Sequence, residues 1–245
     1  ALNRAGASLA QARARAQALS ARVAQAEQLA ALGRVAAGMA HEIRNPIAAM
    51  RLRAENALAA DDATRPRAAL QAILAQVARL DRLIAELLEM TRARQPAPVA
   101  TDLAALLRGC AAELDESGTR ITVESPERVV LLDSALLRRA LDNLVQNALR
   151  HAPPGGVVRI IAAAQNGRLL IRVQDDGAGV PEALRGQLFE PFVSGHADGT
   201  GLGLAIAREM AHAQGGSLAL TRPAQPTEFT LDLPLLPEGA VWPAS

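Results

Sequence analysis

The chain has 245 residues, which is enough for two domains of ordinary size, and 50% of them are hydrophobic but only 2% aromatic. A formal net charge of +1 excludes the strongly basic surface of a general nucleic-acid-binding protein, and a single cysteine excludes an internal disulfide framework. No apolar run in the sequence is long enough to span a bilayer. We therefore expect aliphatic cores and a reducing compartment, with Cys110 as a buried thiol among apolar neighbours.

Residues 1–60 are predicted to form one long helix, because no proline or strong turn signal comes before Pro46. Within residues 1–32, leucine, valine and alanine keep the alternating three- and four-residue spacing of a coiled-coil seam. An alanine-rich helix held by its neighbours is the alternative. Because the chain starts directly in this helix, at Ala1, we expect it to be a piece of a longer protein.

The segment around His41 has the pattern of a functional helix. Apolar residues recur there at every fourth position, at Val35, Met39, Ile43 and Ile47. His41 is off this stripe and should face solvent, with Asn45 one turn later on the same face. Pro46 cannot donate a hydrogen bond to the carbonyl of Glu42, so we expect the helix to bend beside the histidine. A solvated helix with one surface histidine is the alternative.

A turn is predicted at residues 61–66, which contain Asp61, Asp62, Thr64 and Pro66. A second helix should follow to about Arg94, with a wide apolar face of leucine, isoleucine and valine. The two helices of a hairpin cannot cover such faces alone, so two copies should pair into a four-helix bundle. The sequence therefore predicts a homodimer.

Gln95-Pro96-Ala97-Pro98 cannot continue the helix and indicates a linker. Beyond it we expect helices at 102–115 and 134–151, and a third helix that ends near Gln214. The expected strands are 120–124, 129–132, 156–165, 168–175, 217–221 and 227–233, with a hairpin turn at Asn166-Gly167. This mixed order of helices and antiparallel strands predicts a two-layer α/β sandwich.

Polar residues of this second part suggest a site for a phosphorylated ligand. Asn143 and Asn147 share a face of the helix 134–151, next to Arg150 and His151. Amide oxygens are suitable ligands for Mg²⁺, and an arginine can neutralise phosphate charge. Two asparagines on a helix are also common as ordinary surface residues, so this pattern alone does not distinguish a ligand site from an ordinary helix surface.

Two glycine-rich stretches follow. In Asp175-Asp176-Gly177-Ala178-Gly179, a carboxylate at a strand end can accept a hydrogen bond from a flat ligand, although Asp-Gly is also a common turn. The sequence Gly199-Thr200-Gly201-Leu202-Gly203 opens onto a helix, where free N–H groups and the helix dipole favour a phosphate. It is neither a P-loop nor a Rossmann fingerprint, because no Gly-Lys pair and no βαβ unit accompany it. Between them, Phe189 and Phe192 are either anchors of a lid or a local hydrophobic plug.

In chain order, His-Glu-x-x-Asn-Pro, Asn-x-x-x-Asn, Asp-x-Gly-x-Gly, Phe-x-x-Phe and Gly-x-Gly-x-Gly resemble the H, N, G1, F and G2 boxes of the sensor histidine kinases of two-component systems. The resemblance covers roughly residues 30–235. It implies the following division of the chain: a signalling coiled coil at 1–32, a dimerization and phosphotransfer domain at 33–95, a linker at 96–98, a Bergerat-type ATP-binding domain at 99–237 and a tail at 238–245.

The resemblance also implies roles for individual residues in the first domain. His41 would accept the γ-phosphoryl group of ATP on a ring nitrogen, and Glu42 would act as the general base. Asn45 would orient water for the dephosphorylation of the partner, a response regulator. The regulator is expected to dock near Ala48, Arg51 and Leu52.

In the second domain, the resemblance implies a nucleotide site. Asn147 would ligate Mg²⁺, supported by Asn143, and Arg150 would face the phosphates beside His151. Asp176 would bind the exocyclic amine of adenine, and Gly177 and Gly179 would make room for the base. The implied lid contains Phe189, Phe192, Gly199, Thr200, Gly201, Leu202 and Gly203.

One departure from the family pattern lies after Phe192, where many relatives carry Thr-Thr-Lys or another basic residue. This chain has Val193-Ser194-Gly195-His196 instead, so we expect a weak or pH-sensitive contribution of the lid through His196. The resemblance further implies a cytoplasmic fragment of an inner-membrane protein, attached to the membrane only through an N-terminal sensor outside this sequence.

Two other functions are considered. The first is a catalytically silent dimeric scaffold that binds nucleotide, against which the intact His41, Asn147 and Asp176 argue. The second is an ATPase of the related chaperone and topoisomerase superfamily, which does not explain the His-Glu-x-x-Asn-Pro helix.

Overall fold

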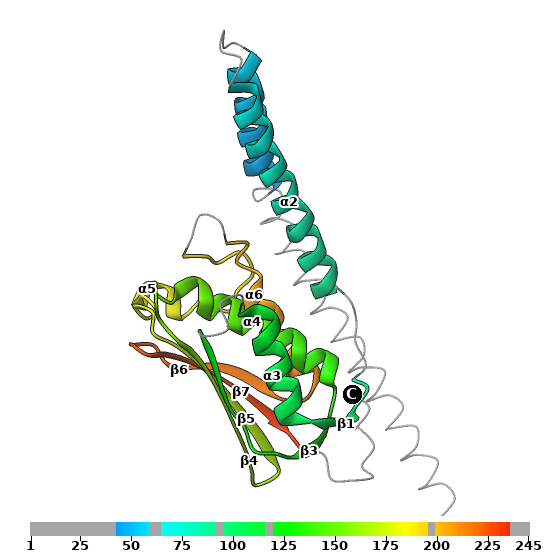
Figure 1. Ribbon diagram of the computed structural model, residues 1–245. Coiled ribbons are helices and arrows are strands. Elements are labelled where there is room, and N and C mark those ends of the chain that lie inside the picture. Colours follow the sequence, from blue (N-terminus) through cyan, green and yellow to red (C-terminus); the bar gives the residue numbers. More distant parts are fainter. Residues whose placement is uncertain (1–42, 59–64, 92–95, 116–119, 196–198, 236–245) are drawn as a thin grey trace, which may run out of the picture. The chain divides into compact units, whose positions relative to one another are not determined.

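The computed structural model describes residues 43–58, 65–91, 96–115, 120–195 and 199–235 (Figure 1). The chain divides into two compact units, 1–84 and 85–245, and the division falls inside the helix α2 (Arg65–Thr91). None of the described helices is long and apolar enough to cross a membrane. The predicted coiled coil at 1–32 lies outside the described residues.

The first unit contains a helix over residues 43–58 and most of α2, which confirms the predicted helical hairpin. Pro46 lies within the first helix and is buried, and Leu83 of α2 is 5% exposed. Other large apolar side chains of these helices are exposed in the single chain: Ile47, Leu52, Leu58, Leu70, Leu74, Val77 and Ile84. The hairpin therefore presents uncovered apolar faces.

The second unit is built on a five-stranded mixed sheet. Its strands, in spatial order, are β2 (Ile121–Glu124), β4 (Val158–Gln165), β5 (Arg168–Asp175), β7 (Thr227–Pro234) and β6 (Ser217–Arg222). β2 and β4 are parallel, whereas the remaining neighbours are antiparallel. The helices α3 (Leu103–Leu114), α4 (Ser134–His151) and α6 (Gly203–Ala213) lie on one face of the sheet (Figure 1). This arrangement confirms the predicted two-layer sandwich.

The buried face of the sheet follows the period-2 alternation of β-strands. Along β5, the side chains of Leu169, Ile171 and Val173 are buried. Arg168, which precedes them, and Arg172, which lies between the last two, are exposed. The β4–β5 hairpin turns at Asn166 and Gly167, whose φ angles of 52° and 72° are those of a type I′ turn. The predicted hairpin is confirmed, and the residues on its buried face are aliphatic.

Two helices of this unit, α3 and α4, begin at aspartate caps. The carboxylate of Asp102 accepts from the N–H of Ala105 at the start of α3. Asp133 does the same at the start of α4, where it accepts from the N–H groups of Ala135 and Leu136. The bounds of α4 agree with the predicted helix 134–151. Cys110 is fully buried on α3, as expected, and desolvation raises the pKa of its thiol to about 11.

Two elements were missed by the sequence analysis. β1 (Val99–Asp102) pairs antiparallel with β3 (Val129–Leu132) as a separate two-stranded sheet. Its four residues, Val-Ala-Thr-Asp, are mostly exposed and carry no alternating apolar pattern. The second is α5 (Glu182–Arg185), a single turn of helix between the two glycine-rich stretches.

Candidate functional site

One wall of a pocket in the second unit is the polar face of α4. The side chains on this wall are Asn143, Gln146, Asn147, Arg150 and His151. Their spacing of three and four residues puts them on one side of the helix, and the opposite side packs into the core. The amide nitrogen of Asn143 donates to the carbonyl of Arg139 at 2.8 Å, which leaves its oxygen on the side of Gly203.

The opposite wall carries a buried carboxylate, that of Asp175 at the end of β5. Asp175 continues the alternation of Leu169, Ile171 and Val173, so it lies on the helix side of the sheet and is 2% exposed. Burial raises the pKa of Asp175, while hydrogen bonds from the N–H of Gly177 and the hydroxyl of Thr227 act in the opposite direction. Asp175, Thr227 and Gly179 all line the pocket.

Asp176, which the sequence analysis assigned to adenine, is directed elsewhere. Its carboxylate forms an ion pair with Arg159 at 2.8 Å and accepts from the N–H of Val157 at 3.0 Å. It is not among the residues that line the pocket. Because Asp176 follows Asp175 directly, it leaves the strand on the opposite side. The structure thus moves the candidate carboxylate by one residue, from Asp176 to Asp175.

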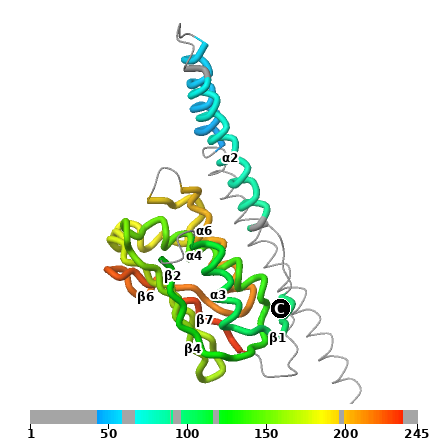
Figure 2. Tube along the Cα trace, viewed as in Figure 1, coloured from blue at the N-terminus to red at the C-terminus, as the bar shows by residue number. Residues whose placement is uncertain are grey.

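Residues of the segment between β5 and α6 also line the pocket, and Figure 2 shows the described part of this segment in yellow beside α4. Phe189 packs edge-on against Phe229 of β7, with ring centroids 6.3 Å apart. The guanidinium of Arg208 on α6 lies 5.6 Å from the Phe189 ring centroid and 3.8 Å from the carboxylate of Glu190. The first phenylalanine of this segment is therefore held by both the sheet and α6.

The second phenylalanine is held by the glycine-rich loop. The N–H of Phe192 donates to the carbonyl of Gly201 at 3.0 Å, and both residues have positive φ angles, 67° and 68°. A Cβ on residue 201 would lie 2.5 Å from the carbonyl carbon of Phe192, so this crossing requires glycine. Nearby, Thr200, Gly201 and Gly203 line the pocket, and Gly199 and Leu202 are buried.

Several predicted site residues lie outside the described residues or away from the pocket. His41, Glu42 and His196 belong to the stretches that the structure does not describe, so their roles remain predictions. Asn45 is exposed on the helix 43–58. Gly177 donates its N–H to the Asp175 carboxylate and thereby supports the pocket wall.

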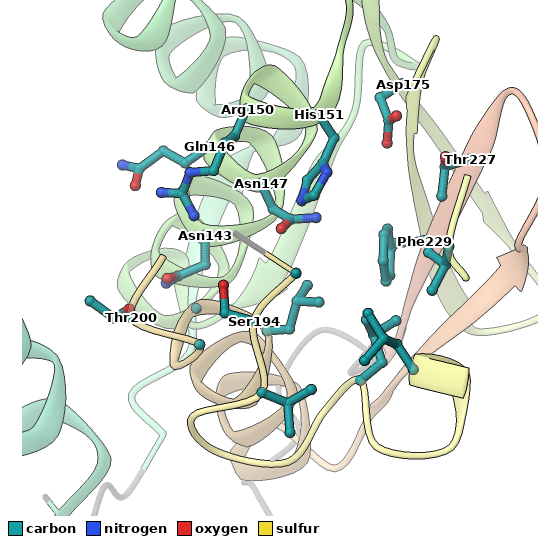
Figure 3. Close-up of a pocket in the computed structure, with 18 of the residues that line it drawn as sticks. Asn143, Gln146, Asn147, Arg150, His151, Asp175, Ser194, Thr200, Thr227 and Phe229 are labelled. Atoms are coloured by element: carbon teal, nitrogen blue, oxygen red, sulfur yellow. The ribbon is translucent and has the colours of Figure 1, made fainter. Parts of the chain in front are cut away.

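Figure 3 shows how the side chains are arranged around the pocket. Asn147 and His151 project from α4 toward the side where Asp175, Thr227 and Phe229 lie, whereas Gln146 and Arg150 project on the side of Asn143. The pocket thus has one end with a buried carboxylate beside an aromatic ring and another with amides, a guanidinium and a glycine-rich loop. This combination fits a ligand with a flat base at one end and phosphates at the other.

The metal expected at this site is Mg²⁺, and the donor set agrees with it in part. Within the described residues, no group of three or more His, Cys, Asp or Glu side chains could hold a metal ion by itself. Mg²⁺ is commonly held by one or two protein oxygens, phosphate oxygens and water. The amide oxygen of Asn147 on the pocket wall is a suitable single protein ligand of that kind.

The pocket-lining residues that the sequence analysis did not assign to the site include Gln146 and Thr227. Gln146 was missed although it lies three residues after Asn143, on the same helix face. Thr227 was missed because its place depends on its pairing opposite Asp175. The period-2 alternation of β5 was the signal that would have selected Asp175 over Asp176.

Comparison with known protein families gives two matches. Residues 31–96 match the His Kinase A (phospho-acceptor) domain, and residues 132–237 match the histidine kinase-, DNA gyrase B-, and HSP90-like ATPase family. The pocket described above lies largely within the second match.

Curated relatives and solved structures agree with these matches. The chain is 30% identical over 226 residues to the signal transduction histidine-protein kinase AtoS of Escherichia coli, covering 89% of this chain and 37% of AtoS. It is 34% identical over 219 residues to the sensor-like histidine kinase SenX3 of Mycolicibacterium smegmatis, covering 82% of this chain and 57% of SenX3. The chain therefore spans well under two thirds of either relative.

Among solved structures, the histidine kinase ThkA in complex with the response regulator protein TrrA has a TM-score of 0.73 and 25% identity, covering 87% of this chain and 65% of that one. Full-length ShkA in complex with AMPPNP has a TM-score of 0.61 and 29% identity, covering 73% of this chain and 40% of that one.

Proposed function

Because this chain carries the phospho-acceptor and ATPase domains of the sensor histidine kinases of two-component systems, we propose that it transfers the γ-phosphoryl group of ATP to His41. It then passes that group to an aspartate on the receiver domain of a response regulator. The observation that carries the proposal is the pocket, in which the buried carboxylate of Asp175 faces the polar side of α4. We also propose that Asn45 orients the water that dephosphorylates the regulator.

The base of ATP occupies the end of the pocket at Asp175. A carboxylate held by the N–H of Gly177 and the hydroxyl of Thr227 keeps an acceptor atom fixed, to which the exocyclic amine of adenine donates. Phe229 provides an apolar surface beside this position, and Leu184 and Leu188 line the pocket as well. Burial of the carboxylate strengthens the hydrogen bond because water does not compete for it.

The phosphates lie at the end formed by α4 and the glycine-rich loop. Arg150 offsets their charge, and the backbone N–H groups at the start of α6 cradle them. Asn147, supported by Asn143, would hold Mg²⁺, which would offset the negative charge of the phosphates. Catalysis by this wall is a matter of positioning and charge stabilisation.

The transfer itself requires His41 as a nucleophile with a free lone pair on one ring nitrogen. Glu42 accepts the hydrogen bond of the other ring nitrogen and so selects the reactive tautomer. A bond forms between the ring nitrogen that carries the free lone pair and the γ-phosphorus, the bond from that phosphorus to the β,γ-bridging oxygen breaks, and ADP leaves. The same phosphoryl group is later attacked by an aspartate carboxylate of the regulator.

The partners follow from the exposed faces of the helical hairpin and from the relatives. The uncovered apolar side chains of the helix 43–58 and α2 pair with those of a second copy in a four-helix bundle. The regulator docks near Ala48, Arg51 and Leu52, in keeping with ThkA, a relative crystallised with its response regulator protein. The parent protein carries an N-terminal sensor at the inner membrane, and the present chain is its cytoplasmic part.

The test is incubation with γ-labelled ATP and Mg²⁺, in parallel with the variants His41→Gln and Asn147→Ala. We expect acid-labile, base-stable label on the chain and its loss in both variants. Nucleotide binding without any label would favour the silent scaffold. ATP hydrolysis that persists unchanged in His41→Gln would favour an ATPase of the chaperone and topoisomerase superfamily.

A further inference from the structure

The carboxylate of Asp133 joins two segments that are far apart in the sequence. One oxygen, Oδ1, accepts from the N–H groups of Ala135 and Leu136, at 3.0 and 2.9 Å, and so caps α4. The other oxygen, Oδ2, accepts from the N–H of Ala97 at 2.9 Å. Asp133 is 8% exposed; its bond from Leu136 is buried, and the bonds from Ala135 and Ala97 are partly buried.

Ala97 has a special place in the linker. Its neighbours on both sides, Pro96 and Pro98, have no backbone N–H, so Ala97 supplies the single donor of residues 96–98. This N–H group donates to the carboxylate of Asp133 and not to a carbonyl within the linker. The linker is therefore attached to the second unit at residue 97, two residues before β1 begins at Val99.

The other end of this connection is the helix that bears the phosphate-binding side chains. α4 is a continuous helix from Ser134 to His151, and Asn143 and Asn147 lie two to four turns beyond its capped end. The linker and the first turn of α4 therefore share one carboxylate, while the pocket residues lie further along the helix.

We infer that Asp133 is a positioning residue for phosphoryl transfer: by binding Ala97 and capping α4 with the same carboxylate, it fixes where the tether from the phospho-acceptor domain leaves the ATPase domain. This inference rests on the proposed kinase function. The tether must bring His41 to the γ-phosphate in a productive orientation, and an anchored tether restricts the search for that orientation. Asp133 is not among the residues that line the pocket, so its loss should slow the transfer and leave ATP binding unchanged.

The experiment compares variants that break this connection on either side. In Asp133→Asn, the amide oxygen still caps α4, but the amide nitrogen presents a donor to the N–H of Ala97. In Ala97→Pro, the donor is removed and Asp133 is intact. The matched control is Asp102→Asn, which makes the same change at the cap of α3, where the carboxylate binds Ala105 and no linker residue is involved.

Two readouts are measured on the whole 245-residue chain. The first is the rate of labelling from γ-labelled ATP at saturation, together with the ATP concentration that gives half of that rate. We expect the saturated rate to fall at least five-fold in Asp133→Asn and Ala97→Pro, with the half-saturating concentration within two-fold of the parent chain. Asp102→Asn should leave both values within two-fold.

The second readout is amide hydrogen exchange at Ala97, which does not depend on kinase activity. We expect protection in the parent chain and its loss in Asp133→Asn. Fast exchange at Ala97 in the parent chain, or an unchanged saturated rate in both variants, would overturn the inference. So would a fall in Asp102→Asn equal to that in Asp133→Asn, since that result would indicate a cap effect alone. Protection at Ala97 in a parent chain that is not labelled at all would contradict the proposed kinase function, and the positioning role would fall with it.

Discussion

Thr227 lies directly opposite Asp175 in the antiparallel pairing of β7 with β5, and both side chains are buried on the helix side of the sheet. The Thr227 hydroxyl hydrogen-bonds the carboxylate, in addition to the N–H of Gly177 at 2.9 Å. A strand-end carboxylate is thus held in one orientation by two donors. This pair closes the end of the pocket that we assign to adenine.

Replacement of Asp175 by asparagine should weaken ATP binding. The amide oxygen can still accept from Gly177, but the amide nitrogen then faces the exocyclic amine of adenine, donor against donor. A hydrogen bond to a charged group contributes about 1.5–3 kcal/mol, so the affinity should fall about ten- to a hundred-fold. Calorimetric titration with ATP measures the change.

The neighbouring substitution Asp176→Asn is the matched control. Asp176 pairs with Arg159 outside the pocket, so we expect an ATP affinity within about three-fold of the parent chain. A large loss in Asp176→Asn together with normal binding in Asp175→Asn would contradict the assignment and restore Asp176 as the adenine ligand.

The raised pKa of Asp175 predicts opposite effects of pH on binding and on stability. Burial disfavours the charged carboxylate in the folded protein, so protonation sets in above the ordinary value of 3.8. ATP binding should weaken as the pH falls through the raised pKa, because the neutral acid is a poorer acceptor. In the absence of nucleotide, Asp175 stabilises the fold below its unfolded pKa, and this stabilisation is lost as the pH rises through the folded pKa.

Chemical unfolding of the parent chain and Asp175→Asn over this pH range tests the second effect. Asparagine does not ionise, so the variant should gain stability relative to the parent chain as the pH rises. A relative stability that stays constant from acidic to neutral pH would show that the pKa of the Asp175 carboxylate is not raised in the folded state.

Gly201→Ala should disturb the lid. A left-handed φ costs a non-glycine residue about 1–2 kcal/mol, and the new Cβ would also press on the backbone of Phe192. We expect the affinity for ATP to fall about ten-fold. Gly186→Ala is the control, because its φ is −71° and a Cβ there meets no atom within 4 Å. Equal affinities of the two variants would remove the lid role from Gly201.

Asp81 lies in the middle of an exposed apolar seam on α2, which consists of Leu70, Leu74, Val77, Ile84 and Leu88. Asp81 keeps their three- and four-residue spacing, so in a homodimer it faces the interface. Burial of a leucine contributes about 1.5–3 kcal/mol, and Asp81→Leu should therefore lower the dimer dissociation constant at least about ten-fold. Analytical ultracentrifugation measures it.

The control for the seam is Arg82→Leu, because Arg82 is exposed and lies beside the seam. This variant adds the same side chain without extending the seam and should leave the dissociation constant nearly unchanged. A tighter dimer in Arg82→Leu alone would place the interface on another face of α2.

Arg51→Glu tests the docking of the regulator. Arg51 is largely exposed and forms a surface ion pair with Glu55, at 2.7 Å, which contributes about 0–1 kcal/mol to stability. The variant should therefore fold and take up label at His41 like the parent chain. Transfer of that label to the regulator should slow about ten-fold or more, because charge reversal acts on association. Arg53→Glu, at an exposed position two residues away, is the control, and equal transfer by both variants would exclude this docking surface.

The sequence predicted those parts of the fold that local patterns determine. The predicted bounds of β4, β5 and α4 lie close to the observed ones, and the dipeptide Asn166-Gly167 indicated the turn between the two strands. The order of the five motifs was enough to predict the family, since each motif is short and local. β1 escaped prediction because its stability comes from pairing with β3 and not from its own residues.

The choice between Asp175 and Asp176 shows what the tertiary structure decided. Both are carboxylates in the same motif; the alternation along β5 favours Asp175, and the structure shows that Asp175 lines the pocket while Asp176 pairs with Arg159. The same holds for Thr227, which reaches the pocket by pairing with a strand about fifty residues earlier, and for the bond from Asp133 to Ala97. The sequence determined which chemical groups the protein has at its site, because residue types and helical or strand periods are local properties. The tertiary structure decided which of these groups meet, because that depends on strand register and chain crossings between residues far apart in the sequence.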